Sequence, residues 1–286
     1  MIEWDDIRRA LPTLVPALDG TSTARRGVVT LADGKQVFVK IATNEHSFHS
    51  IQSEVRVYRW LEKANYGHAP YLLAASNAGD GLALPDLSAW DWQHVWSEAK
   101  LDAAFAALDE LAALPGALDY FSQTTYGSNP WRDMPDELSV YAQFLDEQSL
   151  QKVESILSNT EQRAEYARIA DSEPWRGTDL VHYDARADNF AYDPASNHGC
   201  FVDWNWAGLG NTAFDRTGLL VAAQLTGFDV LMNHKHRIDL NSLVWLMGFW
   251  LQRSVLQSRT EGEGAVRLRP LRVANALQAH ELLMRF

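Results

Sequence analysis

The sequence predicts an α+β fold with two lobes. A small N-terminal lobe over residues 1–87 holds an antiparallel sheet and one helix, and a larger, mainly helical lobe follows over residues 88–286. Short strand-like runs separated by turn residues dominate the first third of the chain. Apolar residues at helical spacing dominate the remainder. The segment from Pro85 to Ser88 breaks the first pattern and marks the expected hinge.

The first elements of the sheet are two strands joined by a tight turn. The runs Gly27–Leu31 and Gln36–Ile41 flank Asp33-Gly34, a dipeptide typical of short hairpin loops. Side chains alternate between the two faces of a strand, so Lys40 points away from its β-branched neighbours. Those neighbours, on the other face of the second strand, are Val37, Val39 and Ile41.

One helix and a second hairpin complete the N-terminal lobe. The helix is predicted from an apolar stripe at near-helical spacing, with Glu54 beside it. The stripe consists of Phe48, Ile51, Val55, Tyr58 and Leu61. The hairpin pairs residues 71–74 with residues 82–84 around a turn at 77–81 that is rich in Asn, Gly and Asp.

The C-terminal lobe is predicted to be helical with a few short strands. Amphipathic patterns cover residues 101–112, 138–145 and 150–157, and residues 115–135 are expected to form a loop with limited helix. Two or three further helices end the chain. Short strands are expected between these helices at Leu180-Val181, Phe190–Tyr192 and Cys200–Asp203.

Composition and charge exclude several classes of protein. Apolar residues make up 47% of the 286 residues and charged residues 22%, so a large core is possible. The formal net charge of -12 disfavours broad binding to nucleic acid or to an anionic membrane, and it is compatible with a cationic substrate. We therefore expect neither nucleic-acid nor membrane partners.

The chain is expected to be cytoplasmic. Its single cysteine, Cys200, excludes an intrachain disulfide and is interpreted as a small buried hydrophobe. The acidic N-terminus lacks the basic and then apolar pattern of a signal peptide. The longest apolar stretch, Leu243–Leu251, is interrupted by Gly248 and is too short to span a bilayer.

Three polar residues occupy the ends of short strands. Asp184 follows Leu180-Val181, Asn189 comes directly before the strand at Phe190, and Asp203 ends the next strand. A hairpin of the last two strands would bring Asn189 and Asp203 together near the loop that carries Asp184. Carboxylate and amide oxygens are ligands that Mg²⁺ prefers, and phosphoryl transfer requires a carboxylate near the attacking hydroxyl. The pattern favours a kinase-like site.

These motifs resemble those of a known enzyme family. His182-x-Asp184 followed by Asn189, and then Val202-Asp203-Trp204, is similar to the catalytic and metal-binding motifs of the aminoglycoside phosphotransferase and choline kinase enzymes. That family has the bilobal protein-kinase-like fold. The likeness covers the chain from about Gly20 to Asp215, and the order of lysine, glutamate, catalytic loop and aspartate is the same.

The resemblance implies a role for each matching residue. Asp184 would be the catalytic base, Asn189 and Asp203 would hold Mg²⁺, and Lys40 would contact the α- and β-phosphates of ATP while pairing with Glu54. An adenine pocket is implied at the hinge. Its expected residues are Leu84, Asp86 and Leu87.

Some positions depart from the family pattern. Tyr183 stands where the family often has glycine, and its ring would narrow the approach of the acceptor. The expected phosphate loop, Asp19–Gly27, does not match G-x-G-x-x-G. Ser22 and Thr23 are therefore expected to bind phosphate through hydroxyl and backbone groups, with Arg25 or Arg26 adding positive charge. The chain also lacks the Phe-Gly and Ala-Pro-Glu motifs of protein kinases. We therefore consider a protein substrate less favoured than a small-molecule acceptor.

Other polar and aromatic residues near these motifs have open roles. Arg186 either steadies the transferring phosphate or pairs with a neighbouring carboxylate, and His182 is expected to orient the catalytic loop. The chain has 11 tryptophans, and most are assigned to core packing. Trp204 and Trp206 are the substrate-side candidates because they follow Asp203 so closely.

The leading hypothesis is an ATP- and Mg²⁺-dependent phosphotransferase acting on a hydroxyl of a small molecule, with an aminoglycoside or another antibiotic as the first acceptor class. Sugars, choline-like amines, amino alcohols such as homoserine, and macrolides stay open as acceptors. The competing hypothesis is a kinase-like protein that binds a nucleotide or small ligand without phosphoryl transfer. The sequence determines neither the choice of ATP over GTP nor the oligomeric state.

Overall fold

A computed structural model describes residues 2–17, 23–122, 129–135, 138–256 and 266–286 of the chain. The chain forms two compact units. The first consists of residues 1–116 and 182–207, and the second of residues 117–181 and 208–286. The expected N-terminal lobe, 1–87, lies within the first unit, and the division of the chain into lobes at Leu87 stays a prediction.

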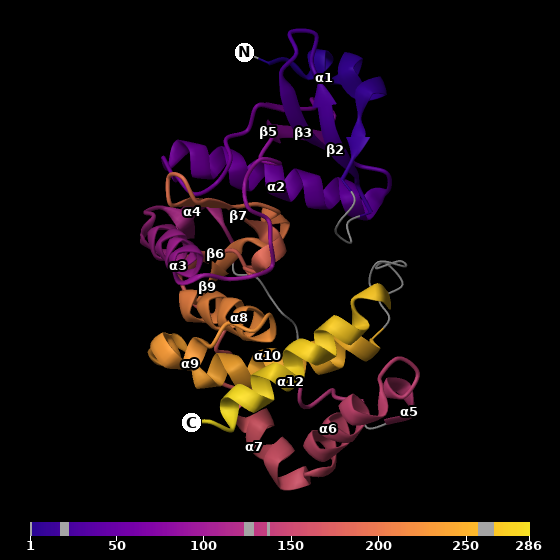
Figure 1. The fold of residues 1–286 in the computed structure, drawn as a ribbon, viewed down its shortest axis with the longest axis vertical. Helices are drawn as coiled ribbons and strands as arrows, with labels where there is room; N and C mark the ends of the chain where they lie inside the picture. Colours follow the sequence, from indigo (N-terminus) through magenta and orange to yellow (C-terminus); the bar gives the residue numbers. More distant parts are fainter. Residues whose placement is uncertain (1, 18–22, 123–128, 136–137, 257–265) are drawn as a thin grey trace. The chain divides into compact units, whose positions relative to one another are not determined.

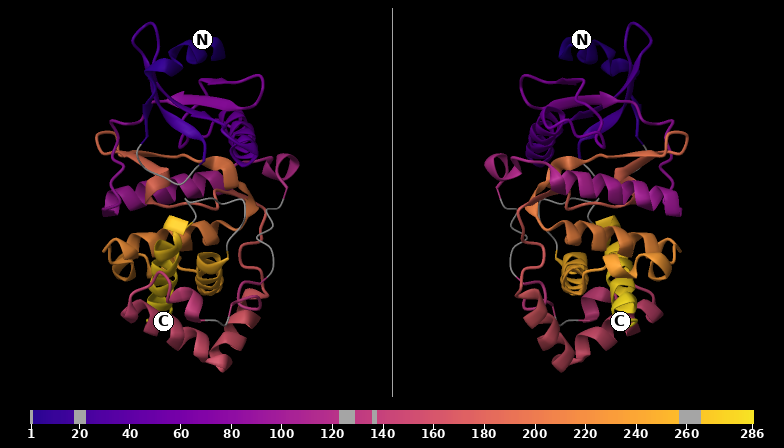
Figure 2. Two further views of the ribbon diagram at one scale, coloured as in Figure 1. Left: turned by 90° about the vertical axis from the view of Figure 1, so that its right-hand side faces the viewer. Right: turned by 90° about the vertical axis from the view of Figure 1, so that its left-hand side faces the viewer.

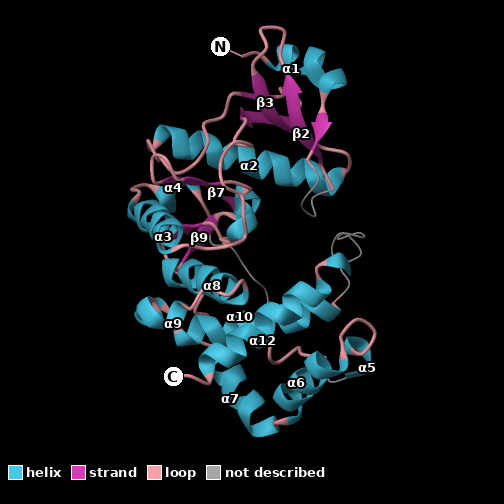
Figure 3. Cartoon of the chain, viewed as in Figure 1, coloured by secondary structure: helices cyan, strands magenta, loops and turns pink. Residues whose placement is uncertain are grey.

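The first unit contains a five-stranded sheet with the strand order β1-β2-β3-β5-β4, in which all neighbouring strands are antiparallel. Figure 1 labels β2, β3 and β5 of this sheet, and Figure 3 shows its strands in magenta. Its strands are β1 (Val15–Pro16), β2 (Arg25–Thr30), β3 (Gln36–Ile41), β4 (Ala74–Ala75) and β5 (Gly81–Pro85). The predicted turn at Asp33-Gly34 joins β2 to β3, and the Gly34 amide donates to the Leu31 carbonyl at 2.9 Å. The second hairpin is shorter than predicted, because residues 71–73 precede the strand.

The two faces of this sheet have different partners. Val37 and Val39 are fully buried on one face, where they pack with Ile7 of helix α1 (Trp4–Ala10). The other face carries Lys40, which contacts helix α2 (Glu45–Lys63). The four predicted stripe residues Ile51, Val55, Tyr58 and Leu61 of α2 are buried, and Phe48 is half-buried.

The first unit also contains another helix and the hairpin of β7 and β8. Helix α3 (Glu98–Ala113) packs against β8 (His198–Phe201), which pairs with β7 (Phe190–Asp193) as predicted. Two short 3₁₀ turns flank this hairpin, η2 (Ala187–Asn189) before it and η3 (Trp204–Trp206) after it. The catalytic-loop motif and the aspartate motif therefore lie at the same end of one hairpin.

The second unit is mainly helical, with one two-stranded sheet formed by β6 (Asp179–Val181) and β9 (Gly208–Gly210). Helices α10 and α12 lie side by side (Figures 1 and 2). The helices described in this unit include α4 (Ala117–Tyr120), α5 (Leu138–Tyr141), α6 (Glu147–Ser158), α7 (Thr160–Ala170), α8 (Thr212–Leu225), α9 (Val230–Asn233), η4 (Lys235–Arg237), α10 (Leu240–Val255) and α12 (Arg269–Leu283).

Two helices of this unit differ from the prediction. The expected helix over 138–145 ends at Tyr141, and its last four residues form a turn. Helix α7 was not predicted, because only Tyr166 and Ala170 of its residues are buried and no apolar stripe marks it. Within the described residues, no helix combines the length and the apolar character that crossing a membrane requires.

Candidate active site

Lys40 lies at the centre of a buried ion-pair network in the first unit. Its ammonium Nζ is 2.8 and 2.9 Å from the two carboxylate oxygens of Glu54. The same atom is 2.8 Å from Asp203 Oδ1, although Lys40 and Asp203 are 163 residues apart in sequence. The predicted pairing of strand lysine and helix glutamate is thus present, and it includes the aspartate of the later motif.

Burial and ion pairing act in opposite directions on the charged groups of this network. Burial opposes the charged form of Lys40, but the Asp203 and Glu54 carboxylates outweigh it and raise the pKa of the ammonium. Burial also opposes ionisation of Asp203, but Lys40 outweighs it and holds the pKa of that carboxyl below its usual range. Burial raises the pKa of Glu54 to about 7, against the opposing pull of Lys40.

His182 fixes the start of the catalytic loop. Its Nδ1 accepts a hydrogen bond from the Asp184 amide at 3.2 Å, so the ring proton is on Nε2, which donates to the Val202 carbonyl at 2.9 Å. Burial lowers the pKa of this fully buried imidazole to about 4. The ring therefore joins the Asp184 loop to the Asp203 segment as a neutral group, which agrees with the orienting role expected for it.

Asp184 is held by Asn189. The Asn189 amide nitrogen donates to both the carbonyl and the carboxylate Oδ2 of Asp184, each at 2.9 Å. Burial raises the pKa of Asp184 to about 6, and the Arg186 guanidinium acts in the opposite direction. A carboxylate with a pKa close to neutrality is suited to accept a proton in catalysis.

Arg186 pairs with its neighbours in the loop. Its Nε is 3.1 Å from Asp184 Oδ1 and 3.1 Å from Asp188 Oδ1. The Asp184 carboxylate is the main cause of the raised pKa of Arg186. Of the two roles left open by the sequence, the contacts support pairing with neighbouring carboxylates.

Asp203 has an uncommon backbone conformation. Its φ and ψ angles of 65° and 52° lie in the left-handed region, which non-glycine residues adopt at some cost. Directly before it, the Val202 amide donates to the Asn189 carbonyl at 2.9 Å. The hairpin therefore fixes Asn189 and Asp203 beside each other at its end, as predicted.

The side chains of Asn189 and Asp203 fit a hard cation. Because the Asn189 nitrogen is used by Asp184, its oxygen remains as an acceptor, and Asp203 has Oδ2 in addition to the Oδ1 that contacts Lys40. Asn189 is 4% exposed, so its orientation is fixed by packing. Oxygen donors of this kind match the preference of Mg²⁺.

The sheet face that carries Lys40 also carries an apolar row that was not predicted as a whole. Val28, Phe38 and Leu84 pair directly across β2, β3 and β5, so their side chains lie next to one another on this face. Val28 and Phe38 are half-buried, and Leu84 is 3% exposed. The register between strands identifies Val28 and Phe38, whereas the sequence pattern indicated only Leu84.

The other predicted nucleotide residues have local roles that the structure describes. The Asp86 carboxylate accepts from the Ser88 amide at 2.9 Å, and the Leu87 carbonyl accepts from the Trp92 indole at 2.8 Å. The Thr23 carbonyl accepts from the Thr43 hydroxyl at 2.6 Å. Ser22 lies outside the described residues.

A family profile and solved structures were compared with the chain. The profile of the phosphotransferase enzyme family matches residues 13–232. The chain belongs to this family. It is therefore a phosphotransferase, as expected from the sequence. No curated protein matches the chain significantly in sequence.

Solved structures with this fold include members of the phosphotransferase family. The GDP complex of aminoglycoside 2'-phosphotransferase-IIIa is similar with a TM-score of 0.58 and 14% identity, covering 97% of this chain and 98% of the other. An aminoglycoside phosphotransferase from Alicyclobacillus acidocaldarius has a TM-score of 0.57 and 11% identity, covering 100% and 96%. A choline kinase from Streptococcus pneumoniae has a TM-score of 0.55 and 12% identity, covering 99% and 98%. These likenesses confirm the protein-kinase-like fold.

The substrate-side aromatic residues of this phosphotransferase differ in burial. Trp204 is 0% exposed, its indole donates to the Phe201 carbonyl at 2.9 Å, and its ring packs on His182 with centroids 4.5 Å apart. It is a core residue, which corrects its assignment to the acceptor side. Tyr183, with a φ of 63°, is 8% exposed, whereas Trp206 is 47% exposed and remains the aromatic candidate for acceptor contact.

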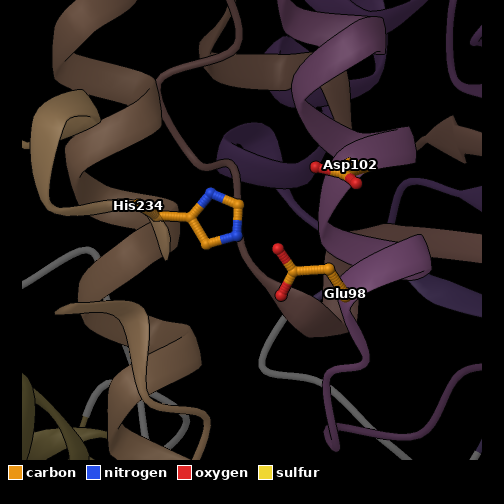
Figure 4. A group of neighbouring side chains, drawn as sticks. All are labelled: Glu98, Asp102 and His234. Carbon is orange, nitrogen blue, oxygen red and sulfur yellow. The ribbon is translucent and has the colours of Figure 1, made fainter. Parts of the chain in front are cut away.

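One further acidic pair lies on α3. Glu98 and Asp102 project from successive turns of this helix and are both exposed (Figure 4). The histidine drawn with them, His234, belongs to the second unit. Within the first unit the two carboxylates form an exposed pair, and we assign no metal site to them.

Proposed function

We propose that this phosphotransferase transfers the γ-phosphoryl group of ATP to a hydroxyl of a small molecule, with Mg²⁺ as its metal ion. The observation that carries the proposal is that Lys40 contacts both Glu54 and Asp203, while the Val202 amide, next to Asp203, donates to the Asn189 carbonyl in the loop of Asp184. Phosphoryl transfer depends on positioning and on electrostatic stabilisation, and this network supplies both.

Asp184 is the proposed catalytic base. Its carboxylate takes the proton of the acceptor hydroxyl as the hydroxyl oxygen forms a bond to the γ-phosphorus. The bond from that phosphorus to the β–γ bridging oxygen breaks, and ADP leaves with the electron pair. Asn189 keeps the carboxylate oriented through the hydrogen bond of 2.9 Å to Oδ2. Arg186 counters the charge of Asp184 before the proton arrives.

The nucleotide site is proposed on the sheet face of Lys40. Lys40 binds the α- and β-phosphates, and Glu54 holds the ammonium in place. The row of Val28, Phe38 and Leu84 contacts the adenine ring, together with the hinge residues Asp86 and Leu87. Thr23 and Ser22 bind phosphate from the preceding loop. Mg²⁺, bound by Asn189 and Asp203, would neutralise charge on the phosphates.

The proposed acceptor is an aminoglycoside or another antibiotic, with Trp206 and Tyr183 on the acceptor side. The net charge of -12 favours a cationic acceptor of this kind over a neutral sugar. The solved structures with this fold include kinases of aminoglycosides and of choline, and both acceptors are cationic amines. An acceptor panel should therefore contain aminoglycosides, choline-like amines, amino alcohols, macrolides and neutral sugars.

The test is ATP turnover on this panel by wild type, D184N and D188N. D184N removes the base and keeps the shape of the side chain, so turnover should fall at least about a hundredfold. D188N is the matched control, because Asp188 lies in the same loop and also contacts Arg186. Equal activity of D184N and wild type would refute the mechanism. Mg²⁺-dependent ATP binding without turnover on any acceptor would instead support a binding protein of this fold.

A further inference from the structure

The register of β2 and β3 distinguishes two neighbouring arginines. Arg26 pairs directly with Lys40 across the two strands, and Arg25 pairs with Ile41 (strands in Figure 1). Directly paired residues of antiparallel strands point to the same face, and successive residues point to opposite faces. Arg26 therefore shares the face of Lys40, whereas Arg25 lies on the opposite face.

The backbone at Arg26 is held between β3, with which β2 pairs, and the segment of β1. The Arg26 carbonyl accepts from the Ala17 amide at 3.1 Å on the side of β1. The next residue, Gly27, approaches β1 so closely that a Cβ placed on it would lie 2.1 Å from the Val15 carbonyl oxygen. Any side chain at position 27 would push β1 away. Arg26 thus projects from a fixed point of the sheet.

Two adjacent rows on this face have complementary chemistry. Arg26 and Lys40, which pair across β2 and β3, are cationic, and Leu82 completes their row on β5. The row of Val28, Phe38 and Leu84 is apolar throughout. The rows are two residues apart along the strands, which corresponds to about 7 Å. A nucleotide has the same arrangement, because a flat apolar base is joined through a sugar to a polyanion.

A polyanionic ligand on this face needs more positive charge than Lys40 supplies. Like charges directly opposite each other on a sheet destabilise it. The Lys40 ammonium is already engaged by the carboxylates of Glu54 and Asp203, each at 2.8 Å. Lys40 alone therefore brings little net positive charge to a phosphate. The Arg26 guanidinium is a second cation on the same face, and its planar fork matches two phosphate oxygens.

We propose that Arg26 binds non-bridging oxygens of the nucleotide polyphosphate and acts together with Lys40 as the second phosphate-binding cation. This inference rests on the proposed nucleotide-dependent function. The expected phosphate loop lacks the G-x-G-x-x-G pattern, and this inference assigns a phosphate-binding role to one arginine at its end. Arg26 is half-buried at the start of β2, and all of the residues concerned belong to the first unit.

The experiment measures ligand binding by isothermal titration calorimetry with the full chain and Mg²⁺. The variants are R26A, R26K and the matched control R25A, and the ligands are a non-hydrolysable ATP analogue, ADP and adenosine. R26A should raise the Kd for the ATP analogue and ADP about ten- to a hundredfold, the range of a lost charge-assisted hydrogen bond. It should leave the Kd for adenosine unchanged. R26K should retain part of the affinity, and R25A should retain nearly all of it.

Three outcomes would overturn the inference. The first is an unchanged Kd of R26A for the ATP analogue, and the second is an equal loss of affinity for adenosine, which would indicate a general disturbance of the sheet. The third is an equal effect of R25A, which would indicate long-range charge alone. Failure of the proposed function has a different signature, because wild type would then bind neither the ATP analogue nor ADP.

Discussion

His182 should make the stability of the chain depend on pH in a defined window. The imidazole is fully buried, and burial lowers its pKa to about 4, with the Arg186 and Lys40 cations acting in the same direction. An unfolded histidine has a pKa of about 6.5. Between these values the unfolded chain takes up a proton that the folded chain does not. The free energy of unfolding therefore falls as the pH falls from about 6.5 to about 4.

The size of this effect follows from the difference between the two pKa values. A difference of about 2.5 pKa units corresponds to about 3 kcal/mol when the window is crossed completely. At pH 5 the loss relative to pH 7.5 is about 2 kcal/mol, because the folded imidazole is still mostly neutral there. The geometry gives the physical reason. A proton on Nδ1 would face the Asp184 amide, which already donates to that atom at 3.2 Å.

The assay is urea unfolding of wild type and H182Q at pH 7.5 and pH 5.0, followed by far-UV circular dichroism. Glutamine can still donate to the Val202 carbonyl but does not titrate. H182Q should be less stable than wild type at pH 7.5, and its loss between the two pH values should be smaller by about 2 kcal/mol. H49Q, on the exposed part of α2, is the control and should lose as much stability as wild type. If H182Q and wild type lose the same amount, the reasoning is refuted.

Three further predictions test other parts of the first unit. Because burial raises the pKa of Asp184 to about 6 and the base must be ionised, kcat/KM should fall tenfold per unit below about pH 6; a profile flat to pH 5 would contradict it. Lys100 is 1% exposed and donates to the Gln93 carbonyl at 2.6 Å and to Asp91 at 3.2 Å. K100M should therefore lower the free energy of unfolding, measured in urea, by about 2 kcal/mol, whereas K63M at an exposed site should leave it unchanged. Burial raises the pKa of the Cys200 thiol to about 12. A thiol reagent at pH 8 should therefore modify the folded chain roughly a thousandfold more slowly than the urea-unfolded chain. Comparable rates for the two chains would contradict this burial.

The parts of the fold that could be predicted are those determined by local chemistry. The Asp33-Gly34 turn fixes its hairpin without help from the rest of the chain, and the stripe of α2 indicates both the helix and its buried face. Helix α7 could not be predicted because it buries little apolar surface. The helix expected over 138–145 ends at Tyr141, whose hydroxyl donates to the Leu251 carbonyl at 3.2 Å, a contact between distant segments.

The site residues were predictable by type and order but not by contact. The motif around Asp184 and Asn189 is local, so the hydrogen bond between them follows from a spacing of five residues. The contact of Lys40 with Asp203 depends on how two hairpins pack, and no sequence pattern contains that information. Trp204 was misassigned for a related reason. The left-handed conformation of Asp203 turns the chain, and the next side chain enters the core.

The net charge of the site affects the binding of both the nucleotide and the acceptor. The carboxylates of Glu54, Asp184, Asp188 and Asp203 outnumber the nearby cations Lys40, Arg26 and Arg186. A site with excess negative charge repels a nucleotide polyphosphate, so cations from outside the chain are needed to reverse the sign. Asn189 and Asp203 offer the oxygens for such cations at the end of the β7–β8 hairpin. The same excess disfavours an anionic acceptor and attracts a cationic one. We therefore propose that metal-dependent nucleotide binding and a preference for an amine-bearing acceptor both follow from this charge distribution.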